Sequence, residues 1–204
     1  MLLRSFKTLP LATLLSSVPL AAAHAVILIN LYNTGVDAGG SALAGGNGAN
    51  DPHYTVTATT IPGVVIGDLA KTYLNGAYVA DSSSSRRVPD SGSPFNGNGA
   101  FSISFTFDLT GYDPTTAAVS GLWGVDNDGE IFINGVSTGN TLLESSVNNF
   151  NQLHAYSINT GFVAGLNTLT VAVADSGSPA AARIDGIFGS ANLFRRFPSP
   201  PHGR

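Results

Sequence analysis

Ser137 lies in a stretch that matches a catalytic motif, because Gly135–Gly139 reads G-x-S-x-G. In hydrolases this pattern holds a nucleophilic Ser on a sharp turn between a strand and a helix. Here the preceding segments have the pattern of hairpin strands, and before the C-terminal tail the mature chain offers only His53 and His154 as bases. We therefore predict that the chain is not an enzyme, and keep a secreted Ser hydrolase that uses Ser137 as the alternative.

Metal ligands are suggested by the oxygen-bearing run Asp126-Asn127-Asp128-Gly129-Glu130. Calcium takes six to eight oxygen ligands, but the run lacks the twelve-residue pattern of an EF-hand. Tight turns use the same residue types. His53 and His154 lack the paired spacing of a zinc site, which indicates hydrogen-bonded loop residues. We predict no cofactor, with calcium as the alternative, in this run or around Asp37 and Asp51.

Aromatic side chains could form a platform on which sugar rings stack. The single Trp of the chain stands at the end of an apolar strand, where burial in the core is the more common role. Nearby carboxylate and amide side chains could bind sugar hydroxyls. The predicted ligand-binding residues are Trp123, Tyr112, Tyr78, Asp126, Asn127 and Asn134.

The composition indicates which elements position these residues. Of the 204 residues, 43% are hydrophobic and only 11% charged, with 24 Gly and 11 Pro, a mixture that disfavours disorder and helical bundles. The absence of Cys excludes disulfides and thiolate metal sites. Between positions 24 and 192 only four basic residues face all 13 acidic ones, so no basic stripe for nucleic acid can form.

The two ends of the chain differ from its body. Residues 1–25 have the charged start, apolar stretch and small residues of a signal peptide. Residues 193–204 contain Phe-Arg-Arg-Phe and three prolines without strand or helix periodicity, which predicts an irregular tail with no membrane span.

The body, residues 26–192, has the alternation of β-strands. In Phe101–Leu109 five large apolar residues alternate with four polar ones, so Phe105 and its apolar partners should be buried, with Ser104 facing outward. Asp-Gly and Asn-Gly pairs predict a hairpin over Gly124–Ile131 and a second turn at Asn134-Gly135. We predict a single all-β domain, a β-sandwich or jelly roll preceded by a signal peptide. Further strands are expected over 26–31, 54–59, 117–125, 130–133, 155–158, 167–173 and 182–188.

Six blocks of the body carry a family resemblance: Asn30–Asp37, Asn50–Val56, Phe107–Pro114, Gly121–Asn127, Ile133–Gly135 and Ser157–Leu169. Together they resemble the exported domains of bacterial PEP-CTERM sorting proteins. The Asn-Gly turn and the Gly-Leu-Asn-Thr-Leu-Thr-Val strand are also similar to those of galactose-binding-like jelly rolls. Two features depart from the family: Arg86-Arg87-Val88 stands where a Trp is usual, and the sorting segment is absent.

The resemblance implies an exported, carbohydrate-binding-like β-sandwich of exopolysaccharide-producing bacteria, and it supplies no catalytic residues. The tail is expected to replace the sorting segment through a frameshift. We therefore predict a secreted or envelope-associated protein whose partner is extracellular polysaccharide or another envelope component, with no nucleic acid and no stable membrane span. A purely structural surface protein is the other alternative.

Overall fold

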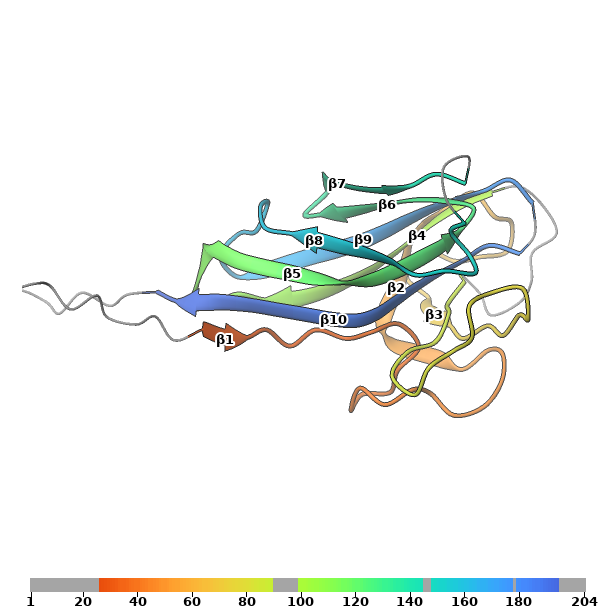
Figure 1. The fold of residues 1–204 in the computed structure, drawn as a ribbon, viewed down its shortest axis with the longest axis horizontal. Coiled ribbons are helices and arrows are strands. Elements are labelled where there is room, and N and C mark those ends of the chain that lie inside the picture. The colour runs from red at the N-terminus through yellow and green to blue at the C-terminus, as the bar shows by residue number, and fades with distance from the viewer. Residues whose placement is uncertain (1–25, 90–98, 145–147, 178, 195–204) are drawn as a thin grey trace, which may run out of the picture.

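The structure is a computed structural model that describes residues 26–89, 99–144, 148–177 and 179–194. The predicted signal peptide and most of the predicted tail lie outside these ranges. Every regular element within them is a strand (Figure 1), and none is a helix that could cross a membrane. The strands are β1 (Val26–Leu28), β2 (Asn50–Thr59), β3 (Leu69–Lys71), β4 (Gly99–Asp108), β5 (Tyr112–Asp126), β6 (Asp128–Ile133), β7 (Val136–Leu142), β8 (His154–Ile158), β9 (Leu166–Asp175) and β10 (Ala181–Leu193).

The strands form two antiparallel sheets that pack face to face. One sheet has four strands in the order β1-β10-β5-β8, and the other has six in the order β3-β2-β4-β9-β6-β7. Apolar side chains from both sheets fill the space between them. This arrangement confirms the predicted all-β sandwich, and most predicted strand segments fall within observed strands. The first strand ends at Leu28 instead of residue 31, and β10 reaches Leu193, one residue beyond the predicted body.

The alternating pattern of β4 determines how the six-stranded sheet faces the core. Phe101 pairs with Val173 of β9 and Phe105 with Leu169, and all four side chains are buried. The predicted burial of Phe101, Ile103, Phe105, Phe107 and Leu109 is confirmed.

Ser104 faces outward as predicted, but its side chain is nevertheless buried. Its side chain is on the outer face but only 6% exposed, because its hydroxyl lies 2.8 Å from the hydroxyls of both Thr57 and Thr170. The three hydroxyls form a row across β2, β4 and β9. A polar residue on the outer face of a sheet can therefore be buried by its neighbours.

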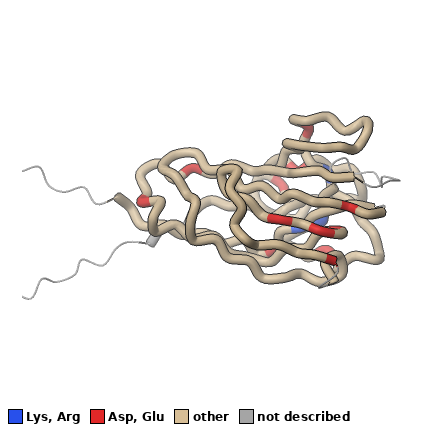
Figure 2. The backbone as a smooth tube through the Cα atoms, turned by 90° about the horizontal axis from the view of Figure 1, so that it is seen from above, with Lys and Arg blue, Asp and Glu red and all other residues tan. Residues whose placement is uncertain are grey.

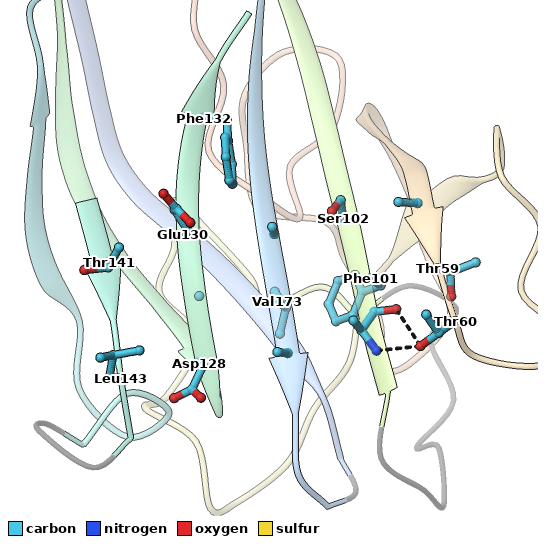
Figure 3. A pocket seen from close by; sticks show the side chains of 15 residues that line it. Thr59, Thr60, Phe101, Ser102, Asp128, Glu130, Phe132, Thr141, Leu143 and Val173 are labelled. Carbon is cyan, nitrogen blue, oxygen red and sulfur yellow. Dashed lines mark hydrogen bonds between the residues drawn. The ribbon is translucent and has the colours of Figure 1, made fainter. Parts of the chain in front are cut away.

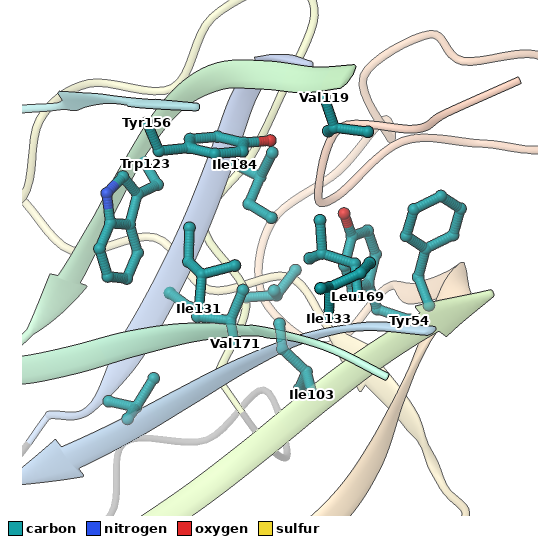
Figure 4. Packing of buried hydrophobic residues seen from close by; sticks show 14 of the residues in the cluster. Tyr54, Ile103, Val119, Trp123, Ile131, Ile133, Tyr156, Leu169, Val171 and Ile184 are labelled. Atoms are coloured by element: carbon teal, nitrogen blue, oxygen red, sulfur yellow. The ribbon is translucent and has the colours of Figure 1, made fainter. Parts of the chain in front are cut away.

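Side chains of β5 from one sheet and of β6 and β9 from the other meet in the core (Figure 4). Trp123 of β5 is 1% exposed and lies among aliphatic side chains of both sheets. Burying these large apolar surfaces is the main favourable contribution to folding. The residues labelled there are Tyr54, Ile103, Val119, Trp123, Ile131, Ile133, Tyr156, Leu169, Val171 and Ile184.

The predicted hairpin over Gly124–Ile131 is wrong. β5 ends at Asp126 in the four-stranded sheet, whereas β6 begins at Asp128 in the six-stranded sheet, so this segment crosses between the sheets. Gly129 is needed for close packing, because a Cβ at this position would lie 2.8 Å from a methyl carbon of Val125. The Asp-Gly pair reflects this contact and not a hairpin turn.

The predicted turn at Asn134-Gly135 is confirmed. It joins β6 to β7, which pair antiparallel, and both turn residues have positive φ, 51° and 79°. This is the left-handed conformation that two-residue hairpins require. The pattern analysis missed both β7 and the short β3. Each is an edge strand of the six-stranded sheet and is short of buried apolar residues.

The sandwich has two distinct ends. Val26 of β1 pairs with Asn192 of β10, so both ends of the described body meet at what we call the terminal end, on the left of Figure 1. At the opposite end, on the right, β6 begins at Asp128 and β9 finishes at Asp175. We call this the groove end. The described Lys and Arg residues lie toward it in Figure 2.

Candidate functional site

A groove of about 430 Å³ opens on the outer face of the six-stranded sheet at the groove end (Figure 3). Its floor consists of small side chains, Ala100 of β4 and Ala172 and Ala174 of β9. Strand alternation turns these residues outward, because their neighbours Phe101 and Val173 face the core. The register places Ala100 opposite Ala174, so two rows of small side chains meet and leave the surface hollow.

The two walls of the groove come from strands on either side of this floor. Thr59 and Thr60 form one wall, and Thr60 is fixed because its hydroxyl accepts a 2.8 Å hydrogen bond from the Ala100 amide. The other wall contains Glu130 of β6, with Thr141 of β7 directly opposite it. Phe132 follows Glu130 on the outer face of β6. Apolar carbon therefore covers most of the bottom, where Ser102 adds one hydroxyl, and oxygen atoms lie along the rim.

Among the described residues that line the groove, two are acidic and none is basic. The Glu130 carboxylate accepts a hydrogen bond from the Ser137 hydroxyl, and the Asp128 carboxylate accepts one of 2.7 Å from the Glu144 amide. Each carboxylate can accept further hydrogen bonds. The groove therefore suits a ligand with apolar carbon on one face and hydroxyl or amino groups at its edge, and it repels anions.

Three of the predicted ligand-binding residues lie together at the groove end. The Tyr78 hydroxyl donates to the Asp126 carboxylate over 2.9 Å, and Asn127 donates to the Glu144 carboxylate over 2.9 Å. Burial raises the pKa of Asp126 to about 6, and the nearby carboxylate of Asp175 acts in the same direction. Tyr78, Asp126 and Asn127 are outside the lining of the groove, so they form a polar cluster of their own.

The other three predicted residues are separate from that cluster. Trp123 is packed in the core and offers no ring face to a ligand. Tyr112 begins β5 at the terminal end, where it lies opposite Leu193. Asn134 is also at the terminal end, and its amide group bonds Gly161, Asn167 and Thr168. Asn134 thus completes the fold, and its donors and acceptor are already used.

Ser137 lies in the edge strand β7, not on a turn between a strand and a helix. Its hydroxyl donates to the Glu130 carboxylate and accepts from the Gly139 amide over 3.1 Å. The described residues form no helix, which the nucleophile motif requires after the Ser. The described residues around Ser137 therefore lack the strand–turn–helix arrangement of the hydrolase motif.

The residues considered for metal binding have other contacts. Asp37 caps its own turn through the Gly39 and Ser41 amides, and Asp51 accepts from the Gly35 amide over 2.6 Å. His53 stacks on Tyr32 with ring centroids 3.6 Å apart. The prediction that His53 and His154 are loop residues is wrong, because His53 lies in β2 and His154 begins β8, although each ring does bond a backbone carbonyl. Within the described ranges no three His, Cys, Asp or Glu side chains are grouped as metal ligands.

The sequence analysis missed the groove itself. The sequence suggests Glu130 only as a calcium ligand and Phe132 only as a strand residue, and the alanines of β4 and β9 give no signal of their own. Alternation along each strand is the signal that places these residues outward. The hollow depends on cross-strand register, which pairs Ala100 with Ala174 and Ser102 with Ala172.

Comparisons with known proteins give only distant similarities. No family model matches the chain, and no curated protein matches its sequence significantly. Among solved structures, the CBM36-1 domain of a multidomain xylanase from the hindgut metagenome of Trinervitermes trinervoides has 15% identity and a TM-score of 0.34, covering 70% of this chain and 98% of that one. An isomalto-dextranase from Arthrobacter globiformis T6, complexed with panose, has 10% identity and a TM-score of 0.27, covering 74% and 23%. At these TM-scores the comparisons assign neither a family nor a ligand.

Proposed function

We propose that this chain is a non-catalytic polysaccharide-binding protein, and that the groove on the six-stranded sheet is its binding site. The observation that carries the proposal is the groove's apolar floor beneath an oxygen-bearing rim. A pyranose ring has the complementary form, with C–H groups on its faces and hydroxyls around its edge. Ala100, Ala172 and Ala174 would contact a ring face, while Glu130, Thr141 and Thr60 would bind hydroxyls.

Phe132 is the aromatic contact in this proposal, in place of the buried Trp123. It lies on the outer face of β6 beside Glu130, at the end of the groove (Figure 3). Aromatic rings contribute large apolar area at low entropic cost, which is why they dominate many binding sites. The two acidic lining residues favour a neutral or amino-sugar polymer in this groove over an acidic one.

Export to the cell surface completes the proposal. Residues 1–25 would be removed as a signal peptide, and the body would act outside the cell or in the envelope, as in the PEP-CTERM-type proteins that it resembles. Because the two ends of the described body lie together at the terminal end, the groove would face away from any attachment there.

Affinity electrophoresis of the mature protein in gels that contain neutral, amino-sugar or acidic polysaccharides tests this function. We expect retardation in at least one neutral or amino-sugar polymer. Phe132→Ala should weaken that binding about tenfold, the effect of losing roughly 1.4 kcal/mol. Phe188→Ala is the matched control, since Phe188 is 52% exposed in β10 of the other sheet, and it should bind normally.

Two results would contradict the proposal. One is migration unaffected by every polymer, including the exopolysaccharide of the source organism, with a folded protein. The other is equal loss of binding in Phe132→Ala and Phe188→Ala, which would place the contact elsewhere. Self-association without polymer binding, measured by light scattering, would favour a structural surface protein instead.

A further inference from the structure

Arg87 differs from the other described arginines in its charge environment. Arg86 pairs with Asp81 and Arg183 pairs with Asp185, each at 3.0 Å. Arg87 is only 1% exposed, yet no carboxylate among the described residues forms a salt bridge with it. It is therefore a buried cation that no carboxylate in the described part of the chain pairs directly.

The guanidinium group of Arg87 has few partners. Nη2 donates to the Phe150 carbonyl over 2.7 Å, and the guanidinium carbon lies 4.0 Å from the centre of the Tyr78 ring. Nε and Nη1 have no hydrogen-bond partner among the described residues. Two donors of a charged group are thus buried and unused, whereas buried polar groups are nearly always hydrogen-bonded.

This arrangement is energetically costly. Burial removes water from Arg87 and lowers the pKa of its guanidinium to about 10. A buried charge is tolerated when it is paired and its hydrogen bonds are satisfied. An oxygen acceptor that reached Nε or Nη1 would satisfy a donor, and a negatively charged acceptor would also compensate the charge.

A second pocket, distinct from the groove, includes Arg87 in its wall. Its volume is about 380 Å³, at the lower end of the usual range for small-molecule sites. Tyr73 and Tyr78 form aromatic parts of the wall, and Asn75 and Asp81 add polar ones. The charge of Asp81 is already engaged, because its carboxylate pairs with Arg86 and accepts from the Arg87 amide.

We propose that this pocket is a binding site for a small hydroxy acid, the chemical class that includes sugar acids, with the ligand carboxylate held by Arg87. The unused guanidinium donors account for the carboxylate. Asn75 and the Tyr73 hydroxyl would bind hydroxyl groups of the ligand, and the aromatic walls would contact its carbon atoms. This site is independent of the groove, whose described lining contains no basic residue, and does not require the proposed polysaccharide function.

Isothermal titration of the mature protein with galacturonate, galactose and acetate tests the ligand class. Galactose has the hydroxyls of galacturonate without the carboxylate, and acetate has the carboxylate without the hydroxyls. We expect galacturonate to bind at least about tenfold more tightly than either. Polygalacturonate, added separately, shows whether the pocket also takes the acid within a chain. Binding of the free acid alone would identify a site for free hydroxy acids.

Variants of the pocket then locate the bound acid. Gly76→Phe keeps Arg87 but fills the pocket, since Gly76 lines it and an added Cβ would meet nothing within 4 Å. Gly46→Phe is the matched control, because Gly46 has equal space but lines neither pocket. Arg87→Lys retains a charge and removes Nε and Nη1. We expect galacturonate binding to fall at least about tenfold in Gly76→Phe and Arg87→Lys and to persist in Gly46→Phe.

Several results would overturn this proposal. They are equal affinities for galacturonate and galactose, acetate binding as tight as galacturonate binding, unchanged binding in Gly76→Phe, or no galacturonate binding at concentrations on the order of 10 mM. The binding result for Arg87→Lys counts only if this variant still unfolds in a cooperative thermal transition. If it does not, Gly76→Phe alone decides whether galacturonate binds in this pocket. Loss of polysaccharide binding through Phe132→Ala would leave galacturonate binding intact, so the two proposals fail separately.

Discussion

The two ends of the sandwich differ in how fully their polar side chains are hydrogen-bonded. At the terminal end, Asn167 is fully buried and its amide group bonds the backbone of Val163 and Gly165 and the side chain of Asn134. Asp108 at the same end accepts hydrogen bonds from the hydroxyl and amide of Thr110, which lower the pKa of its carboxyl. These polar groups form hydrogen bonds that hold the turns at the ends of the strands.

At the groove end, some buried polar groups are desolvated or have no hydrogen-bond partner among the described residues. Burial raises the pKa of Asp126 to about 6, and Arg87 has two unpartnered donors among the described residues. The Asn149 side-chain oxygen is likewise buried without a described partner. Because unsatisfied polar groups reduce stability, their concentration at one end is typical of a region kept for binding. The polar groups of the terminal end complete the fold, whereas those of the groove end agree with the binding role proposed above.

The largest effect that would test this comparison is expected from Asn167→Ala. The substitution removes the hydrogen bonds of the buried Asn167 side chain to the backbone of Val163 and Gly165 and to Asn134, so the free energy of unfolding should fall by about 3 kcal/mol. Urea denaturation followed by Trp fluorescence measures it. Asn151→Ala, at an exposed position, should change the same quantity by less than about 0.5 kcal/mol. Similar losses in both variants would contradict a structural role for the Asn134–Asn167 network.

Asp126→Asn should stabilise the protein at neutral pH. The folded state holds the Asp126 proton more tightly than the unfolded state, whose carboxyl pKa is about 4, so this group favours folding below that pH. Its contribution is lost as the pH rises through about 6. At pH 7.5 the variant should be about 1 kcal/mol more stable, a rise of roughly 2–4 °C in Tm. Near pH 4 the difference should disappear.

Asp108→Asn provides the opposite control at the terminal end. The folded pKa of this carboxyl is lowered, so its contribution to stability is present at neutral pH and lost as the pH falls through that value. The variant should therefore have a slightly lower Tm than the wild type at pH 7.5 and an equal Tm at low pH. A pH dependence of the same sign for Asp126→Asn and Asp108→Asn would show that the two ends do not differ electrostatically.

An effect about as large as that of Asp126→Asn, but of opposite sign, is expected from Ser104→Ala, which interrupts the hydroxyl row between the two ends. Because the Ser104 hydroxyl bonds Thr57 and Thr170, its loss should cost about 1 kcal/mol in the free energy of unfolding. Thr106→Ala, at an exposed position of the same strand face, should cost little. Equal losses at the two positions would mean that the hydroxyl row adds no stability.

The fold could be predicted from the sequence where alternation is strong. In β4 every second residue from Phe101 to Leu109 is large and apolar, and this pattern determines the buried face. The connection from Asp126 to Asp128 could not be predicted, because a crossover between sheets and a hairpin turn use the same Asp, Asn and Gly. The contact of Gly129 with Val125 that distinguishes them is tertiary.

The candidate site was less accessible to sequence analysis than the fold. Tyr78, Asp126 and Asn127 do lie at one end, but Tyr112, Trp123 and Asn134 lie elsewhere. They were chosen by residue type, and residue type alone does not predict where a side chain lies in the fold. The groove arises from small residues, which carry no chemical signal individually. Its shape requires the register between β4 and β9, and that register depends on long-range pairing.

The most direct test of the groove as the binding site is chemical-shift mapping on the ¹⁵N-labelled protein with the oligosaccharide of the polymer that binds best. We predict that the largest shifts of backbone amides cluster at Ala100, Gly129, Glu130, Ala172 and Ala174, on the outer face of the six-stranded sheet. Largest shifts on the outer face of the four-stranded sheet, or at the terminal end around Tyr112, would contradict the account.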